Sequence, residues 1–135
     1  MAATGQPRAG RRGQRRRLSR SADFDRVFRE GRSFATRHLV LHAFPRPEGD
    51  APEDDEAPLP RLGVSVGRRV GGAVERNRVK RLLREAFWAV APSLLPRHDF
   101  VLVARSEASE LAEAGGEQAF EQALRELAGQ GGLST

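Results

Sequence analysis

The sequence predicts a small α+β domain in which helices pack on a single sheet of three to four strands. Segments whose apolar residues recur at helical spacing alternate with short segments that are continuously apolar or apolar at every second position. Their order is helix, strand, strand, central helix, strand, helix, which is typical of one sheet covered by helices. The length of 135 residues accommodates one such domain and is too short for two ordinary ones.

Local signals place the elements of the first half of the chain. Ser21 is a suitable N-cap for a helix, Phe24 and Phe28 lie on one helical face, and Gly31 provides a stop. In residues 34–44 the side chains alternate between two faces, as they do in an extended segment. We therefore expect a helix followed by a strand.

The second half contains a strand, a long helix, a strand and a last helix. Residues 61–67 alternate apolar and small side chains, and residues 74–90 carry an apolar stripe at helical spacing. Residues 99–104 include a continuous apolar run typical of a buried strand, and residues 117–128 form a helix that ends at Gly129. A helix between two strands indicates a crossover joining parallel strands, which is normally right-handed.

Composition sets three segments apart from the domain, which we expect to span residues 18–128. Residues 1–17 are rich in Gly and Arg without apolar periodicity, which predicts a disordered basic arm. Either this arm contacts a partner or it is a solvated tail. Within the domain, residues 46–60 hold four prolines and six acidic residues and are expected to form a flexible loop insert. Residues 129–135 are expected to be a disordered tail.

Several functional classes are excluded by composition. The chain has no cysteine, which rules out disulfides, thiolate metal sites and cysteine nucleophiles, and which is compatible with a cytoplasmic location. The longest apolar run, residues 86–91, is too short for a membrane span, and the N-terminus lacks the apolar core of a signal peptide. We expect neither membrane insertion nor a small-molecule cofactor.

The charge is segregated along the chain. Residues 1–45 carry a net charge of +8 and residues 61–84 a net charge of +7, while residues 46–60 and 85–135 each carry −5. Two strongly positive blocks on one small domain indicate a polyanionic partner. All but one of the 23 basic residues are arginine, which suits forked contacts with phosphate, although codon bias produces the same surplus.

The central helix concentrates this positive charge. Arg76, Lys80 and Arg84 repeat every four residues and so line one ridge, which we expect to be exposed, with Asn77 and Arg81 in a parallel row. An idle solvated face usually mixes charges of both signs at this spacing, whereas this helix stacks like charges. The pattern favours a partner that neutralises the ridge. The candidate patch comprises Arg68, Arg69, Arg76, Asn77, Arg78, Lys80, Arg81 and Arg84.

The aromatic residues have two interpretations. Phe24 and Phe28 are either core residues or stacking partners for unpaired bases, and the residues alone favour the core because Val27 shares their face. His42 lies on a strand face, where a structural histidine is the default. His38 and His42 are about 13 Å apart along a strand, too far to share a metal ion. We find no catalytic constellation and expect no metal site on the chain.

Residues 74–87, with the signature Arg76-Asn77-Arg78, resemble the bacterial ribonuclease P protein family. Three further segments match in the family's order: residues 17–31, 61–69 and 99–105. The resemblance implies a subunit of a ribonucleoprotein in which a large RNA cuts precursor tRNA to leave the mature 5′ end. It also implies the fold of domain 2 of ribosomal protein S5, with a left-handed crossover instead of the usual right-handed one.

The resemblance further implies specific partners. The protein binds the catalytic RNA and the 5′ leader of precursor tRNA, and it raises the affinity for magnesium, which is held mainly by the RNA. The protein alone is not expected to be catalytic. The candidate patch then becomes the RNA-contact surface. Phe24, Phe28, His42 and Ser65 become the lining of a leader groove between the sheet and the central helix.

Two departures from the family pattern stand out. His42 occupies a position where an aromatic side chain such as Tyr is expected, and the insert at 46–60 is longer than the usual connection. Two other classes stay open on the residues alone. One is a generic RNA- or DNA-binding protein of ribosomal type, and the other is a module whose basic helix binds an acidic protein.

Overall fold

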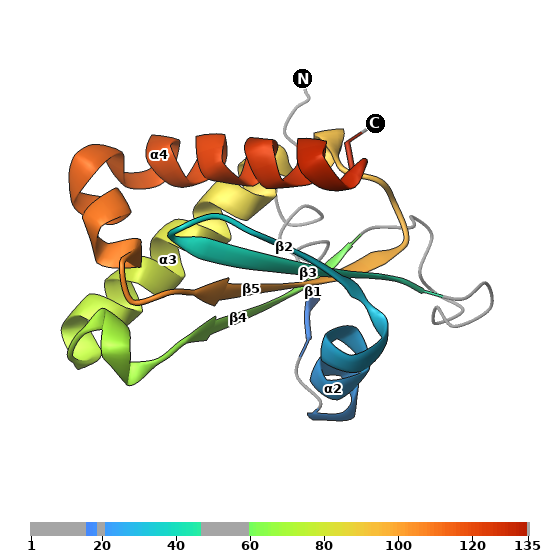
Figure 1. Ribbon diagram of the computed structural model, residues 1–135, viewed down its shortest axis with the longest axis horizontal. Helices are drawn as coiled ribbons and strands as arrows, with labels where there is room; N and C mark the ends of the chain where they lie inside the picture. Colours follow the sequence, from blue (N-terminus) through green and yellow to red (C-terminus); the bar gives the residue numbers. More distant parts are fainter. Residues whose placement is uncertain (1–15, 19–20, 47–59, 135) are drawn as a thin grey trace, which may run out of the picture.

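The computed structural model describes residues 16–18, 21–46 and 60–134 (Figure 1). One mixed sheet has the strand order β1-β4-β5-β3-β2. The strands are β1 (Arg16–Arg17), β2 (Arg32–Ala35), β3 (Leu39–Pro45), β4 (Arg61–Val66) and β5 (His98–Ala104). The helices are α2 (Ser21–Glu30), α3 (Ala73–Val90) and α4 (Ala108–Gly131), with short 3-10 turns η1 (Arg68–Val70) and η2 (Ala91–Ser93).

The sheet is covered on both faces, which confirms the predicted α+β class. Helices α3 and α4 lie against one face and α2 lies against the other (Figure 1). The four longer strands match the predicted number, and β1 adds a two-residue strand at the edge. None of the helices in the described ranges is long and apolar enough to cross a membrane.

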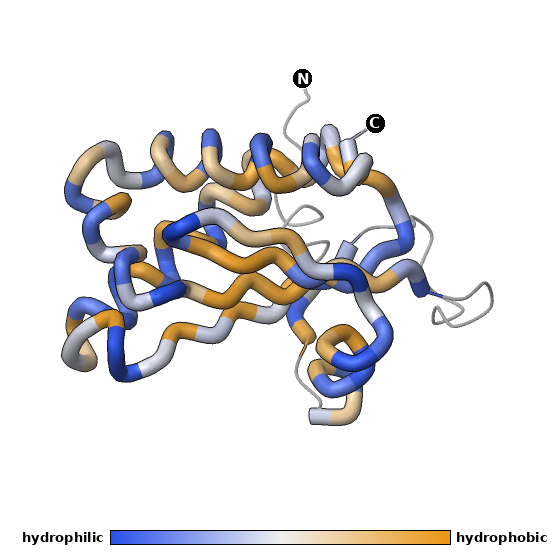
Figure 2. Tube along the Cα trace, in the orientation of Figure 1, coloured by the Kyte–Doolittle hydropathy of each residue, from blue (hydrophilic) through white to orange (hydrophobic). Residues whose placement is uncertain are grey.

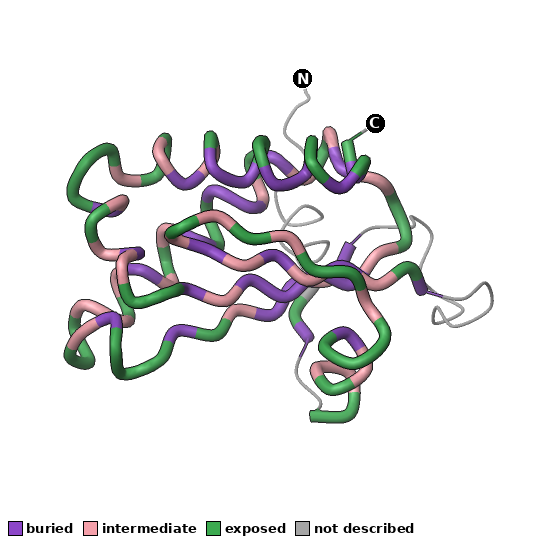
Figure 3. The backbone as a smooth tube through the Cα atoms, viewed as in Figure 1, coloured by how far each residue is buried: buried purple, intermediate pink, exposed green. Residues whose placement is uncertain are grey.

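The main core lies between the sheet and the pair α3 and α4. Leu39 and Leu41 of β3 and Phe100 of β5 pack there with Leu83 and Phe87 of α3. In Figure 2 the apolar colouring follows the strands and the inner sides of α3 and α4, and Figure 3 shows the same positions as buried. Because side chains on a strand alternate between faces, the residues between these core positions point toward α2.

A smaller cluster on the α2 side holds that helix against the sheet. Val27 of α2 and Val101 of β5 are completely buried, and Leu18 joins them. One buried carboxylate also ties the elements together at this end. Asp99 is 0% exposed and accepts two hydrogen bonds from Arg61, at 2.8 and 2.7 Å.

Two further guanidinium groups lie near the same carboxylate. Arg26 of α2 and Arg46, just after β3, each lie 3.7 Å from an oxygen of Asp99. The charge cluster therefore joins α2, β3, β4 and β5. Arg46 was expected in a flexible loop, but it is 8% exposed because its guanidinium pairs with a buried acid. The rest of the predicted insert, apart from the buried Pro60, lies outside the described residues.

The single extended segment predicted at residues 34–44 is wrong, because the structure contains two antiparallel strands there, β2 and β3. The turn between them is built by Thr36. Its Oγ1 accepts hydrogen bonds from the backbone nitrogens of His38 and Leu39, at 3.2 Å each. The turn residues Thr36, Arg37 and His38 include no glycine or proline, so the usual sequence signals of a turn are absent there.

The disordered tail predicted from residue 129 is also wrong. Helix α4 begins at Ala108, kinks at Gly116 (φ 59°, ψ −137°) and continues to Gly131. Leu133 is 2% exposed, and its carbonyl accepts a hydrogen bond from the Leu95 backbone at 2.8 Å. Residues 129–134 stay ordered because Leu133 completes the core, and the left-handed C-terminal cap is Gly132.

The predicted crossover is present, since β4 and β5 are parallel neighbours joined through α3. The left-handed sense implied by the resemblance stays a prediction. Residues 1–15 of the predicted basic arm lie outside the described residues. Arg16 and Arg17, assigned to that arm, instead form β1 and pair in parallel with β4.

Candidate nucleic-acid interface

The outer side of α3 carries the exposed positive charge. The buried stripe of the helix, which includes Val79 and Leu83, faces the core, and the opposite side presents Asn77, Arg81 and Arg84 to solvent. We call Asn77, Arg81 and Arg84 the α3 ridge. Successive ridge residues are three or four positions apart, so they follow one line along the helix.

The exposed ridge differs in detail from the one predicted. Arg76 and Lys80 are only half-exposed, because at 100° per residue they lie closer to the buried stripe than Arg81 does. Arg78 is also half-exposed and lies 3.7 Å from Glu75, one turn earlier on the helix. The prediction that Arg76 and Lys80 line the exposed row is therefore wrong.

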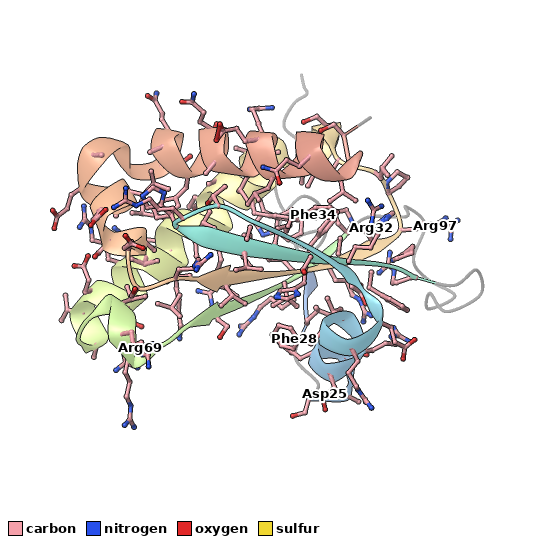
Figure 4. The ribbon with its side chains drawn as sticks, viewed as in Figure 1. Asp25, Phe28, Arg32, Phe34, Arg69 and Arg97 are labelled. Atoms are coloured by element: carbon pink, nitrogen blue, oxygen red, sulfur yellow. The ribbon has the colours of Figure 1, made fainter. Side chains whose placement is uncertain are left out.

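Two more arginines stand at the start of this surface. Arg68 and Arg69 lie in η1, between β4 and α3, and both are exposed; Arg69 is labelled in Figure 4. Val70 is buried and anchors the turn that presents them. Gly71 has a φ of 154°, and a Cβ there would lie 3.0 Å from the Glu75 side chain, so the backbone at the helix entry requires glycine.

The arginines of this surface lack compensating acids. The ion pairs among the described residues involve none of Arg68, Arg69, Arg81 and Arg84. In those parts of the chain, no carboxylate lies within 4.0 Å of these four guanidinium groups. Like charges on neighbouring turns repel one another by a few tenths of a kcal/mol per pair. A polyanion removes this repulsion and gains attraction to each guanidinium, so phosphate-rich ligands are the natural complement.

The other four candidate residues lie on the opposite face of the sheet, beside α2. Phe24 lies against Gly63 of β4, where a Cβ would be 2.5 Å from the ring. The absence of a side chain at Gly63 is therefore what admits the ring. Phe24 is half-buried and packs on the small cluster around Val27. The Phe24 ring therefore contributes to packing, as the residues on its helical face suggested.

Phe28 and His42 form an aromatic pair at the edge of the α2 contact. Phe28, labelled in Figure 4, is 43% exposed, and its ring meets the imidazole of His42 edge-to-face with centroids 4.7 Å apart. Burial lowers the pKa of His42 from its ordinary value. The imidazole is therefore neutral at neutral pH, and it offers a ring face and hydrogen-bonding nitrogens instead of a charge.

Ser65 extends this surface beyond α2. It is exposed on β4, and strand pairing sets it beside Val103 of β5, which in turn pairs with Val40 of β3. We call the surface formed by Phe28, His42 and Ser65, with Phe24 at its base, the α2 face.

The four residues predicted to line a groove between the sheet and the central helix do not lie between them. Helix α3 packs on the other face, since its buried Leu83 and Phe87 share the main core with Leu41, whereas Phe24 belongs to the smaller cluster. Strand alternation separates the two sets, because adjacent residues of β3 point to opposite faces. The candidate residues therefore form two surfaces instead of one.

One feature of the interface escaped the sequence analysis. A shallow pocket of about 230 Å³ lies where β1 meets α3, lined by Arg17, Arg81, Arg84, Glu85 and Trp88. The only signal in the sequence was the spacing of Trp88, four residues after Arg84 and seven after Arg81. The contribution of Arg17 comes from strand pairing.

No metal-binding cluster is formed by the residues that the structure describes: nowhere do three His, Asp or Glu side chains come together.

Comparison with known proteins shows the family to which the chain belongs. A family model described as ribonuclease P matches residues 13–128. The chain belongs to the ribonuclease P protein family. The ribonuclease P protein component of Bacillus pumilus is 40% identical over 98 residues, covering 73% of this chain and 76% of that protein. The protein component of Geobacillus thermodenitrificans is 33% identical over 113 residues, covering 84% and 87%.

Solved structures of the family have the same fold. The RNase P protein of Staphylococcus aureus superposes with a TM-score of 0.68 at 28% identity, covering 88% of this chain and 97% of that one. The protein of Thermotoga maritima gives a TM-score of 0.67 at 28% identity, covering 84% and 96%. The predicted family and the predicted fold of ribosomal protein S5 domain 2 type are confirmed, and the chain is a protein component of ribonuclease P.

Proposed function

We propose that this protein binds the RNA subunit of ribonuclease P through the α3 ridge and η1, and the 5′ leader of precursor tRNA through the α2 face. The catalytic step belongs to the RNA, and magnesium is bound mainly by the RNA. The protein assists cleavage by holding substrate and catalyst together, which raises the effective concentration of one near the other. We expect the protein to carry out this role in the cytoplasm.

The observation that carries the proposal is the separation of two chemically different surfaces. The outer side of α3 and η1 offers guanidinium groups at regular intervals, which suits the phosphates of a folded RNA. The α2 face offers an exposed phenylalanine, a neutral imidazole and a serine, which suits the unpaired bases of a single strand. Because the sheet lies between them, both ligands can bind at once.

Reconstitution tests this proposal against the alternative of a generic ribosomal-type RNA-binding protein. The full chain is added to a bacterial ribonuclease P RNA and a precursor tRNA at a magnesium concentration too low for the RNA alone. We expect cleavage at the mature 5′ end to be restored. An unrelated basic protein of similar net charge is the control. If both proteins restored cleavage equally, or neither did, the subunit role would be contradicted.

Phe28→Ala is expected to weaken binding of a precursor tRNA with a long leader by about tenfold, the scale of one lost base–aromatic stack. Binding of mature tRNA should change little, because it has no leader to place on the α2 face. Binding is measured by titration into the reconstituted holoenzyme. Phe28 is preferred to Phe24 for this test because the Phe24 ring also packs on Gly63.

The matched control for this prediction is Gln118→Ala, which removes an exposed side chain from α4 on the other side of the sheet, away from the α3 ridge. That variant should bind long-leader and leaderless substrates as the parent protein does. An equal loss for both substrates in Phe28→Ala would assign Phe28 to the packing of α2 instead of leader binding.

A further inference from the structure

The pocket at the end of the α3 ridge combines a tryptophan with arginines, and neither of the two proposed surfaces needs such a tryptophan. Trp88 lies half-buried in its wall and packs edge-to-face on Phe87, with centroids 4.9 Å apart and the planes at 89°. Phe87 is 1% exposed, so the indole is fixed from below by a core residue. A planar aromatic group held rigidly beside arginines is a stacking platform.

The charge of the pocket selects an anionic ligand. Three guanidinium groups, from Arg17 on β1 and from Arg81 and Arg84 on α3, line it together with the single carboxylate of Glu85. Each guanidinium offers several donors in a fork that matches phosphate. The arginines come from two elements that both contact β4, β1 as its parallel neighbour and α3 by packing, so the fold brings them to one pocket.

The size of the pocket excludes a whole small-molecule ligand. Its volume of about 230 Å³ is below the roughly 300–1,000 Å³ of pockets that enclose drug-sized ligands, and it is open to solvent. Such a site accommodates one planar ring of a larger molecule. The pocket also continues the α3 ridge, since Trp88 follows Arg81 and Arg84 along the same side of the helix.

We infer that this pocket binds one unstacked nucleotide of an RNA strand, with the base on the indole of Trp88 and the flanking phosphates on Arg17, Arg81 and Arg84. This inference rests on the proposed function, because that function brings RNA to the α3 ridge. It adds a structural requirement to that function: the RNA that follows the α3 ridge has an unpaired base at the end of the ridge.

The chain contains one tryptophan and no tyrosine, so its intrinsic fluorescence reports on Trp88 alone. A short single-stranded oligoadenylate is titrated into the full chain, and binding is followed in parallel by the anisotropy of a labelled copy. We expect quenching of the tryptophan emission that follows the anisotropy curve. A blunt RNA duplex of equal length and inorganic phosphate should leave the emission nearly unchanged, because neither offers a free base.

Two substitutions separate stacking from packing. Trp88→Leu keeps an apolar side chain but removes the ring, and it should weaken oligoadenylate binding about tenfold. Trp88→Phe keeps a ring and should restore most of the affinity. Thermal unfolding of both variants checks that α3 still packs on the core.

The outcomes distinguish this inference from the proposed function. Salt-dependent RNA binding without quenching of Trp88, or equal affinity of the Leu and Phe variants, would overturn the pocket and leave the proposed function intact. Quenching of equal depth by the duplex or by inorganic phosphate would also overturn it. If no RNA bound at all, the proposed function itself would fail.

Discussion

Replacing Arg81 and Arg84 together with alanine is expected to weaken binding of the ribonuclease P RNA by on the order of 100-fold. A hydrogen bond to a charged group contributes about 1.5 kcal/mol or more, and two such contacts amount to about 3 kcal/mol. Both side chains are exposed on α3, and in the described parts of the chain neither is within ion-pair distance of an acid. Their attraction to phosphate is therefore not offset by the loss of an internal pair.

The salt dependence of binding gives the sharper measurement. Each phosphate contact contributes slightly less than one unit to the slope of log affinity against log salt concentration, so the double variant should show a slope lower by about 1.5 to 2. Arg125→Ala is the matched control, because Arg125 is an exposed arginine on α4, away from the α3 ridge. That variant should keep both the affinity and the slope of the parent protein.

The fold should survive the loss of both arginines. Alanine has the highest helix propensity, and removing stacked like charges relieves repulsion, so α3 should be as stable as before. Circular dichroism and thermal unfolding check this point. A loss of helicity in the double variant would show that the α3 ridge is structural, and an unchanged salt slope would show that these arginines do not contact phosphate.

Asp99→Asn is expected to have the largest effect on stability, lowering the free energy of unfolding by about 3–5 kcal/mol. The carboxylate is completely buried and faces Arg26, Arg46 and Arg61. Asparagine preserves the shape but removes the buried negative charge that the three guanidinium groups share, and the remaining contact of Arg61 with Asp23, at 3.8 Å, is the longer of its two ion pairs. Removing one partner from a buried charge cluster lowers the free energy of unfolding by more than the whole cluster contributes to it, because the remaining charges stay buried without their counter-charge.

Urea denaturation measures this effect as a lower transition midpoint. Glu126→Gln is the matched control, since Glu126 is exposed on α4 and its replacement should change the free energy of unfolding by no more than about 0.5 kcal/mol. Adding Arg61→Gln to Asp99→Asn should cost less than the two single changes together, because the residues are directly coupled. Strict additivity, or a loss for Asp99→Asn as small as the control's, would contradict the role assigned to the cluster.

The same cluster supports the α2 face. Arg26 joins it from α2 and also lies over the Phe44 ring, 4.9 Å from the ring centroid. Helix α2 is thereby fixed on the sheet next to Phe28 and His42. The buried charges thus position a surface that they do not themselves form.

Much of this arrangement was predictable from the sequence where the signal is local. The central helix was predicted at residues 74–90 and is observed at Ala73–Val90, because its apolar stripe recurs at helical spacing without interruption. The first helix and the β4 strand were predicted equally closely. Family membership followed from the contiguous signature at Arg76-Asn77-Arg78.

One error was local, because the turn made by the Thr36 hydroxyl contains no glycine or proline to signal it. The others arose where a side chain acts on a distant part of the chain, as Leu133 does when it orders residues 129–134 by filling the core. Arg46 is buried by Asp99, which lies more than fifty positions away in the sequence. None of these contacts leaves a periodic trace in the residues around it.

By itself the sequence determined the α+β class, the helical positions and the existence of a charged helix, because periodicity and charge are properties of neighbouring residues. Only the tertiary structure decided that Phe24 and Phe28 lie across the sheet from α3, and that Arg17 meets Trp88. Strand order and register decide which of these side chains meet. Both depend on how the whole core packs. The candidate residues therefore lie on two surfaces, where the sequence suggested one site.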